Sequence, residues 1–380
     1  MPLGYVGGKA KKTKFLKKHC PLNKFYKRIV LNCCGAGWLF LLEDFSHCNE
    51  VIFSDINPYL INMIKAFSVP EQFLTVFESY MKDNRELHLN PNETLDEAEL
   101  RFSLLYKEWN KELYAKNLNM GEIDFIAAVQ YAFLISHSFA GRHSLRAGFT
   151  YRDGNPMYPN FMKVLNKLKR KKYSQLLKKV IFESIDFEEC LRKYDSPDTF
   201  FYIDPPYWGY EADYDVNNDL FGKYGHIRLA DAVKKLKGLA MISYYNFTYL
   251  ESLYPSSLFN KIGKDFHKSA SNFKKKKSNE KEILITNYSS SGKKHSIMAQ
   301  SSLSIENYIE IAGTVCPKSK KRTRKSYSTD FRRVIVDLIK LGVKKAELMR
   351  QFGIGSYSTL KRWEEKYKFS EVQSISKQAA

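Results

Sequence analysis

The sequence predicts an α/β protein with a doubly wound, mostly parallel sheet, a helical insertion and a C-terminal helix-turn-helix. Short apolar and β-branched runs recur with helical stretches between them, the strand signal disappears over one long segment, and the pattern changes again near the end of the chain. Continuous rather than alternating apolar character is typical of strands that are buried on both faces. It therefore indicates a parallel sheet that is covered by helices.

The expected strands are short runs of apolar residues. Those of the parallel sheet are Ile29 to Cys33, Val51 to Asp55, Val180 to Ser184, Thr199 to Asp204 and Leu239 to Tyr245. A later pair, Asn260 to Phe266 and Glu282 to Tyr288, is separated by a polar, lysine-rich segment. We expect this pair to form an antiparallel hairpin that closes one edge of the sheet.

The segment from Pro70 to about Lys179 shows no strand pattern. Within it, ELRFSLLYKEWNKELY and FIAAVQYAFLISHSF place apolar residues at helical spacing, which predicts a helical insertion in the sheet domain. The insertion ends in FAGRHSLRAGFTYRDGNPMYPNF, whose glycines, arginines and aromatic residues indicate a loop or hairpin over the surface. A solvated loop with buried aromatic residues is the alternative interpretation of this stretch.

The C-terminal part differs in composition from the sheet domain. We expect the sheet domain at residues 1–290, a basic linker at 291–327, a helix-turn-helix at 328–368 and a tail at 369–380. Lysines and arginines crowd the linker between Lys318 and Lys325, where they can contact phosphates.

Three short amphipathic stretches follow the linker and are separated by glycines. This pattern predicts three helices in a helix-turn-helix arrangement. Ser358 or Thr359 is expected to cap the last helix. Lys361 and Arg362 then lie on a helix that can enter a major groove of DNA.

The composition favours a polyanionic partner. The 61 Lys and Arg residues against 41 Asp and Glu give a formal net charge of +20, enough to hold nucleic acid or an anionic surface by counterion release. No apolar run approaches the roughly 20 residues that span a bilayer, and the N-terminus lacks the apolar core of a signal peptide. We therefore expect a nucleic-acid partner and a cytoplasmic location. The six cysteines have neither Cys-x-x-Cys nor zinc-finger spacing, so no metal site is expected.

The sharpest chemical signal is Asp204-Pro205-Pro206-Tyr207, directly after the apolar run FFYI. Sites in α/β proteins lie at the carboxyl ends of strands, where this motif is expected. Asp204 and the carbonyl of Pro205 can accept both N–H bonds of a conjugated amine and direct its lone pair toward a methyl donor. Pro205 and Pro206 hold that carbonyl in a rigid extended turn, and Tyr207 offers a face for stacking a flipped base.

A second chemical signal follows the first strand. Gly35 and Gly37 in Cys34-Gly35-Ala36-Gly37 permit close approach of the backbone to a ligand. The next strand ends in Asp55, at the spacing of an acid that binds ribose hydroxyls. Asn57 and Pro58 are expected to begin a helix. Near the start of the chain, Tyr5 to Lys9 reads Tyr-Val-Gly-Gly-Lys, which by itself is equally compatible with a flexible basic arm.

These motifs, in this order over roughly Leu3 to Tyr288, resemble those of the adenine-N6 DNA methyltransferases related to the orphan enzymes that modify GATC sites. The resemblance implies a Rossmann-like methyltransferase fold, a double-stranded DNA substrate and a target-recognition role for the insertion. It also implies that S-adenosylmethionine is bound by residues spread along the motifs, namely Tyr5, Lys9, Gly35, Gly37, Asp55, Asp186 and Asp204. A restriction endonuclease partner is compatible with this family, and the oligomeric state stays open.

Two departures limit what the resemblance implies. Asn32-Cys33-Cys34 stands where relatives usually carry Phe or Pro beside the glycine turn. The arginine-bearing hairpin, with Arg142, Arg146 and Arg152 as candidate DNA contacts, matches only loosely, so GATC specificity does not follow. The C-terminal helices lie outside the family core and resemble the helix-turn-helix of insertion-sequence transposases.

Two alternative functions remain open at this point. Asp-Pro-Pro-Tyr also occurs in cytosine-N4 DNA methyltransferases and in some RNA methyltransferases, which act on similar conjugated amines. A non-catalytic DNA-binding regulator that uses only the helix-turn-helix is the other alternative. The joint presence of Asp204, Tyr207, Asp55 and Lys9 argues against a relic site.

Overall fold

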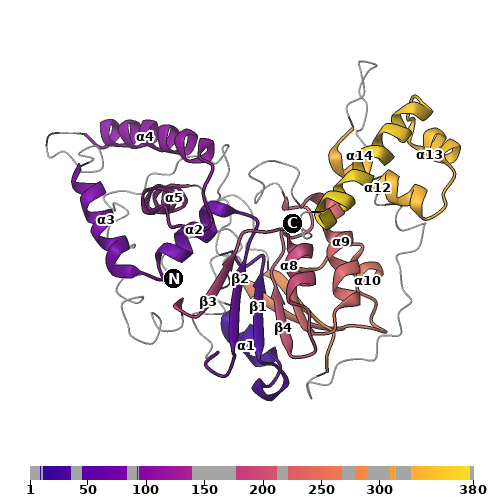
Figure 1. Ribbon diagram of the computed structural model, residues 1–380, viewed down its shortest axis with the longest axis horizontal. Helices are drawn as coiled ribbons and strands as arrows, with labels where there is room; N and C mark the ends of the chain where they lie inside the picture. Colours follow the sequence, from indigo (N-terminus) through magenta and orange to yellow (C-terminus); the bar gives the residue numbers. More distant parts are fainter. Residues whose placement is uncertain are drawn as a thin grey trace.

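The structure is a computed structural model of the 380-residue chain. It describes residues 9, 12–35, 45–83, 92, 94–138, 177–211, 221–267, 279–289, 309–310, 312–313 and 327–376. A central sheet lies between two helical groups, α2 to α5 on one side and α12 to α14 on the other (Figure 1).

The sheet has seven strands in the order β3-β2-β1-β4-β5-β7-β6. Five strands are parallel, and they are β1 (Arg28–Asn32), β2 (Glu50–Ser54), β3 (Val180–Glu183), β4 (Thr199–Ile203) and β5 (Leu239–Tyr245). Strand β7 (Asn279–Thr286) runs antiparallel to β5, and β6 (Asn260–His267) pairs with β7 at the edge. The expected mostly parallel sheet with an antiparallel hairpin at its edge is confirmed.

Both faces of the sheet are buried, which explains why its strands are continuously apolar. Along β1, Ile29 and Leu31 belong to one hydrophobic cluster, whereas Val30 belongs to the other. Helix α1 (Thr13–His19), the short η1 (Asn23–Phe25) and α2 (Pro58–Ala66) contribute to the first cluster. Helices α8 (Phe187–Tyr194), α9 (Gly222–Lys235) and α10 (Leu250–Leu253) contribute to the second.

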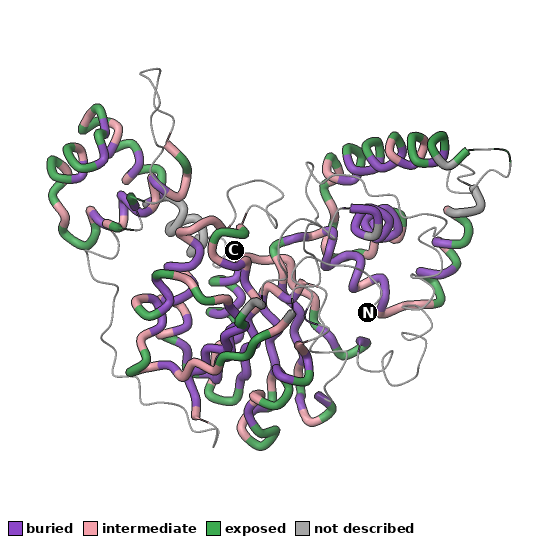
Figure 2. The backbone as a smooth tube through the Cα atoms, turned by 180° about the vertical axis from the view of Figure 1, so that it is seen from behind, coloured by how far each residue is buried: buried purple, intermediate pink, exposed green. Residues whose placement is uncertain are grey.

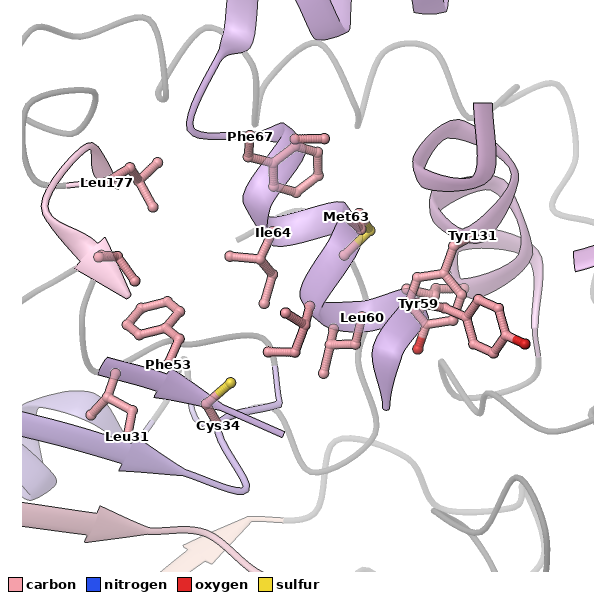
Figure 3. Packing of buried hydrophobic residues seen from close by; sticks show 14 of the residues in the cluster. Leu31, Cys34, Phe53, Tyr59, Leu60, Met63, Ile64, Phe67, Tyr131 and Leu177 are labelled. Carbon is pink, nitrogen blue, oxygen red and sulfur yellow. The ribbon is translucent and has the colours of Figure 1, made fainter. Parts of the chain in front are cut away.

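Helices occupy the described part of the segment that was expected to be an insertion. They are α3 (Pro70–Asp83), α4 (Leu95–Ala115) and α5 (Phe125–His137). Helix α5 is buried along most of its length, and Tyr131 from it packs beside Tyr59 of α2 (Figures 2 and 3). The arginine-bearing hairpin lies within residues 139–176, outside the described residues.

Asn57 joins the sheet domain to these helices. As expected, it begins α2: its side chain accepts hydrogen bonds from the amides of Tyr59 and Leu60 at 3.0 and 3.2 Å, and Pro58 follows it. Its Nδ2 also donates to the hydroxyl of Tyr131 on α5 at 2.9 Å. The residue that ends the turn after β2 therefore also fixes the position of α5.

Three helices form the C-terminal group: α12 (Thr329–Lys340), α13 (Lys345–Phe352) and α14 (Tyr357–Ser376). Gly353, at φ 61°, makes the left-handed turn that ends α13. The cap of α14 differs from the expected one. Ser358 and Thr359 lie inside the helix, and the hydroxyl of Ser356 accepts from the amide of Thr359 at 3.3 Å, because a capping side chain precedes the amide that it binds by three residues.

Helix α12 packs against the sheet domain rather than standing apart from it. Its buried Phe331, Val334 and Leu338 belong to the same hydrophobic cluster as Ile227 of α9. The hydroxyl of Tyr224 on α9 donates to the carboxylate of Asp337 on α12. The basic run from Lys318 to Lys325 lies outside the described residues. Among the helices that are described, none is both long and apolar enough to cross a membrane.

Candidate active site

The Asp-Pro-Pro-Tyr motif lies where expected, at the carboxyl end of β4. The amide of Asp204 donates to the carbonyl oxygen of Asn32, the last residue of β1, at 3.1 Å. The two central strands of the sheet therefore hold the start of the motif between them. Pro205 is buried. Neither Pro205 nor Pro206 has an amide proton that would need a hydrogen-bond acceptor in this turn.

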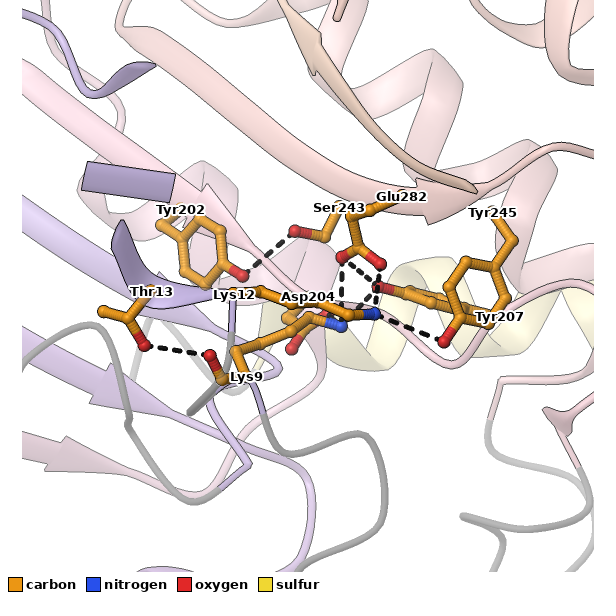
Figure 4. A network of polar contacts seen from close by, with 9 residues as sticks. All are labelled: Lys9, Lys12, Thr13, Tyr202, Asp204, Tyr207, Ser243, Tyr245 and Glu282. Atoms are coloured by element: carbon orange, nitrogen blue, oxygen red, sulfur yellow. Dashed lines mark hydrogen bonds and ion pairs between the residues drawn. The ribbon is translucent and has the colours of Figure 1, made fainter. Parts of the chain in front are cut away.

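A compact cluster of charged groups surrounds Asp204 (Figure 4). Nζ of Lys9 lies 2.9 Å from Oδ1 of Asp204 and 3.4 Å from Oε1 of Glu282. The hydroxyl of Tyr207 donates to Oε1 of Glu282 at 2.7 Å and also accepts from Lys9. Nζ of Lys12 lies 2.5 Å from Oε2 of Glu282. Two ammonium groups thus face two carboxylates, and the side chains of Lys9 and Glu282 are 4 % and 0 % exposed.

Burial and these neighbours set the protonation states. Burial raises the pKa of Asp204 to about 6, although the ammonium of Lys9 opposes the shift. Burial alone would lower the pKa of Lys9, but Asp204 and Glu282 outweigh it and raise the pKa above its ordinary value. Burial also opposes ionisation of Glu282, yet Lys9 and Lys12 hold its pKa below the ordinary value. At neutral pH the cluster therefore holds charged Lys9, Asp204 and Glu282.

Tyr207 is more enclosed than its expected stacking role requires. It is 5 % exposed, Nζ of Lys9 lies 4.3 Å from its ring centroid, and Tyr245 packs edge-on at 4.3 Å between centroids. Lys9 and Tyr245 therefore already contact the ring on which a base is expected to stack. Trp208, the next residue, stacks on Phe247 with the ring planes 4° apart. Stacking on Tyr207 stays a prediction.

Asp55 contacts the glycine turn directly, and its expected role at the ribose hydroxyls stays a prediction. Oδ2 of Asp55 accepts from the amide of Gly35 at 3.1 Å, and Oδ1 accepts from the amide of Asn57 at 3.0 Å. Gly35 has φ 47°, a left-handed conformation that favours glycine. Burial raises the pKa of Asp55, and the two amides partly offset this effect.

Asp186 follows β3 and is already engaged with protein groups. Its carboxylate caps α8 by accepting from the amide of Glu188 at 2.9 Å, and it pairs with Arg228 of α9 at 2.7 Å. Its expected role in binding S-adenosylmethionine stays a prediction.

The carboxylates of Asp55, Asp186 and Asp204 all lie near the turn after β1. Burial raises the pKa of Cys33 in that turn well above the ordinary value, and each of the three carboxylates raises it further. Cys33 itself has φ 52°, so the turn is tightly wound. Each Asp55 oxygen accepts one backbone amide and keeps a second lone pair for a hydroxyl donor. These hydrogen-bond acceptors fit the ribose hydroxyls and amino groups of S-adenosylmethionine, which donate.

The other expected site residues divide into two groups. Lys361 and Arg362 are exposed on α14. The remaining ones lie outside the described residues, and they are Tyr5, Gly37, Arg142, Arg146 and Arg152.

Sequence reasoning missed Glu282 and Lys12. Glu282 is the one acid in the otherwise apolar run Glu282 to Thr286, and this mismatch was the available signal. Its partners, however, come from segments far away in the chain, so the sequence alone does not reveal what it contacts.

The sheet order and the motif at the end of β4 define the chain as a Rossmann-like methyltransferase. Residues 5–269 match the D12 class N6 adenine-specific DNA methyltransferases, and the chain belongs to this family. It is therefore an S-adenosylmethionine-dependent enzyme that methylates adenine in DNA, which decides against a cytosine-N4, RNA or purely regulatory function. No curated protein matches the chain.

Proposed function

We propose that Asp204 and the carbonyl of Pro205 hold the N6 amine of a flipped adenine. The lone pair of this amine is delocalised into the purine ring, so the nitrogen is a poor nucleophile. Two acceptors on its N–H groups draw it toward tetrahedral geometry. When bound, S-adenosylmethionine supplies a methyl group on a positively charged sulfur. In the transfer the carbon–sulfur bond would break and leave a neutral thioether, and the methyl group would become bonded to the nitrogen. The nitrogen would give up one proton, for which Asp204 is the proposed acceptor.

The observation that carries this proposal is the N–H donor already on Asp204. Nζ of Lys9 lies 2.9 Å from Oδ1, which is the distance at which an amine donates to a carboxylate. With a pKa of about 6, Asp204 is ionised at neutral pH and is a stronger base than an exposed aspartate.

For cofactor binding we propose that Asp55 accepts from the ribose hydroxyls and that the turn through Gly35 and Gly37 lies against the cofactor. Tyr5 and Asp186 keep their expected cofactor roles in this proposal. Lys9 contacts Asp204 directly, and we therefore place its main contribution at the catalytic carboxylate.

For DNA binding we propose that the insertion recognises the target through Arg142, Arg146 and Arg152. The C-terminal helices act as a helix-turn-helix that contacts DNA through Lys361 and Arg362. Support comes from the two faces of α14, since Leu360 and Trp363 are buried while Lys361 and Arg362 are exposed. We also propose a restriction endonuclease partner and a cytoplasmic location, because both are compatible with an enzyme that acts on DNA.

Asp204→Asn in the full-length protein tests the catalytic assignment. The variant is incubated with duplex DNA and methyl-labelled cofactor, and the released nucleosides are analysed. We expect kcat to fall by about 100-fold or more, while the Kd for DNA changes by less than about threefold. Asp265→Asn, an exposed carboxylate on β6, is the control and keeps full activity. Wild-type turnover in Asp204→Asn overturns the assignment.

A further inference from the structure

Glu282 is a buried carboxylate that none of the expected roles explains. It lies on β7, in the antiparallel hairpin, and its side chain is 0 % exposed. Burying a carboxylate is unfavourable unless it is paired and hydrogen-bonded. Glu282 is fully paired: Oε1 contacts Nζ of Lys9 at 3.4 Å and the hydroxyl of Tyr207 at 2.7 Å, and Oε2 contacts Nζ of Lys12 at 2.5 Å.

The partners of Glu282 come from two other parts of the chain. Lys9 and Lys12 belong to the N-terminal segment, and Tyr207 belongs to the catalytic motif after β4. Two of these contacts lead back to Asp204, because Lys9 binds Asp204 directly and Tyr207 is the last residue of the same motif. One carboxylate on an edge hairpin therefore ties the N-terminal segment to the catalytic turn (Figure 4).

Lys9 lies between Asp204 and Glu282, and its ammonium group contacts both carboxylates. Without Glu282, the only carboxylate within reach of Lys9 among the described residues is Asp204. Lys9 would then compete more strongly with the target amine for the Asp204 oxygens. Burial raises the pKa of Tyr207 well above its ordinary value, so its hydroxyl stays protonated and donates to Glu282.

We propose that Glu282 is a positioning residue for methyl transfer: it restrains Lys9 and Tyr207 so that Asp204 keeps an oxygen free for the target amine. The proposal rests on the catalytic role of Asp204 proposed above. Glu282 touches neither substrate nor cofactor in this role and acts only through the side chains that it holds.

The charge of Glu282 makes the proposal testable through pH. Among the described residues, several titratable or charged groups interact with Asp204. They are Lys9 and Lys12 from the N-terminal segment, Cys33 and Cys34 after β1, Tyr202 on β4, Tyr207 in the motif and Glu282 on β7. Burial is the main cause of the raised pKa of Asp204, and the negative charge of Glu282 raises it further. Glu282→Gln removes that charge while keeping the shape of the side chain, so the pKa of Asp204 should fall.

The experiment measures kcat and kcat/KM of full-length Glu282→Gln between about pH 5 and pH 8, with duplex DNA and labelled cofactor. We expect kcat at neutral pH to fall by about 10- to 100-fold, and the acid limb of the profile to move to lower pH. Asp265→Asn, on the other strand of the same hairpin but exposed, should show neither effect. A purely structural role would lower activity without moving the acid limb.

A wild-type profile in folded Glu282→Gln overturns the inference, as does a loss of activity with an unmoved acid limb. If Glu282→Gln fails to fold, Tyr207→Phe tests the inference instead. This variant removes only the hydroxyl group that donates to Glu282. A kcat of Tyr207→Phe within about twofold of wild type then overturns the inference. Asp204→Asn is measured alongside. If it is active, the catalytic assignment itself fails; if it is inactive while Glu282→Gln behaves as wild type, only the role of Glu282 fails.

Discussion

Nζ of Lys9 lies 2.9 Å from Oδ1 of Asp204, and the two side chains are 4 % and 17 % exposed. Little solvent screens an ion pair that is buried this deeply, so the charge of each side chain strongly affects the pKa of the other. The protonation state of the carboxylate proposed for catalysis therefore depends on a lysine from a distant segment. This dependence leads to a direct test.

Lys9→Met should shift the pH dependence upward. Burial raises the pKa of Asp204 to about 6, and Lys9 lowers it from a still higher value, so loss of the ammonium raises the pKa further. Since Asp204 must be ionised to accept from the amine, activity is lost as pH falls through its pKa. We expect the acid limb of kcat/KM to move to higher pH, with a loss of about tenfold or more at pH 7 that is partly recovered at higher pH. An acid limb at the wild-type position contradicts the coupling.

Asp55→Asn should weaken binding of S-adenosylmethionine. The variant replaces by an amide the carboxylate that we propose accepts from the ribose hydroxyls, an interaction worth roughly 1.5–3 kcal/mol. We expect the Kd measured by calorimetry to rise by about 10- to 100-fold, with Asp265→Asn unchanged. Because the amides of Gly35 and Asn57 also donate to Asp55, a thermal melt must show that the turn still folds. Unaltered cofactor affinity in a folded variant refutes the role.

Gly222→Ala should destabilise the contact between α9 and α12. Gly222 has φ 46°, and a Cβ there would lie 1.7 Å from Oδ2 of Asp330 on α12. The matched control is Gly342→Ala, because Gly342 also has a positive φ, 93°, but no atom lies within 4 Å of the added Cβ. Both variants strain the backbone, and only the first also displaces Asp330. We expect Gly222→Ala to lose about 1–3 kcal/mol in denaturant unfolding and to lose more than Gly342→Ala. Equal losses in the two variants would mean that the approach of the added Cβ to Asp330 does not affect the free energy of unfolding.

Features that depend on neighbouring residues could be predicted from the sequence. Burial on both faces leaves a continuous apolar run, so the parallel strands were found to within one residue at each end. The start of α2 at Asn57 was also predicted correctly, because a cap depends on residues that are close together in the chain.

Features that depend on long-range packing could not be predicted. The contacts of Lys9 with Asp204 and Glu282 are an example, because only the folded sheet brings these residues together. The expected contact of Lys9 with the cofactor stays a prediction. The docking of α12 on α9 was missed for the same reason, since an amphipathic helix does not reveal which surface covers its apolar face. The cap of α14 was misassigned because several adjacent hydroxyl residues, Ser356 to Thr359, compete for one position.

The C-terminal helices should add DNA affinity through a small number of phosphate contacts. Lys361 and Arg362 are exposed on α14, and each contact with a phosphate releases counterions. Deleting the helices is a poor test, because it would uncover the surface of α9 that α12 buries. The double variant Lys361→Gln, Arg362→Gln removes two charges and leaves this packing intact.

We expect the double variant to weaken DNA binding and to lower the slope of log K against log salt by up to about 2, since each phosphate contact adds roughly 0.9. Lys24→Gln, an exposed residue just before β1 and so at the amino ends of the strands, should leave the slope unchanged. Methylome sequencing separates the remaining alternatives. An unchanged target sequence with a reduced slope supports phosphate contacts, whereas a relaxed or altered target moves base recognition into the C-terminal helices. An unchanged slope rules out DNA contact by Lys361 and Arg362 and leaves this face of α14 for a protein partner.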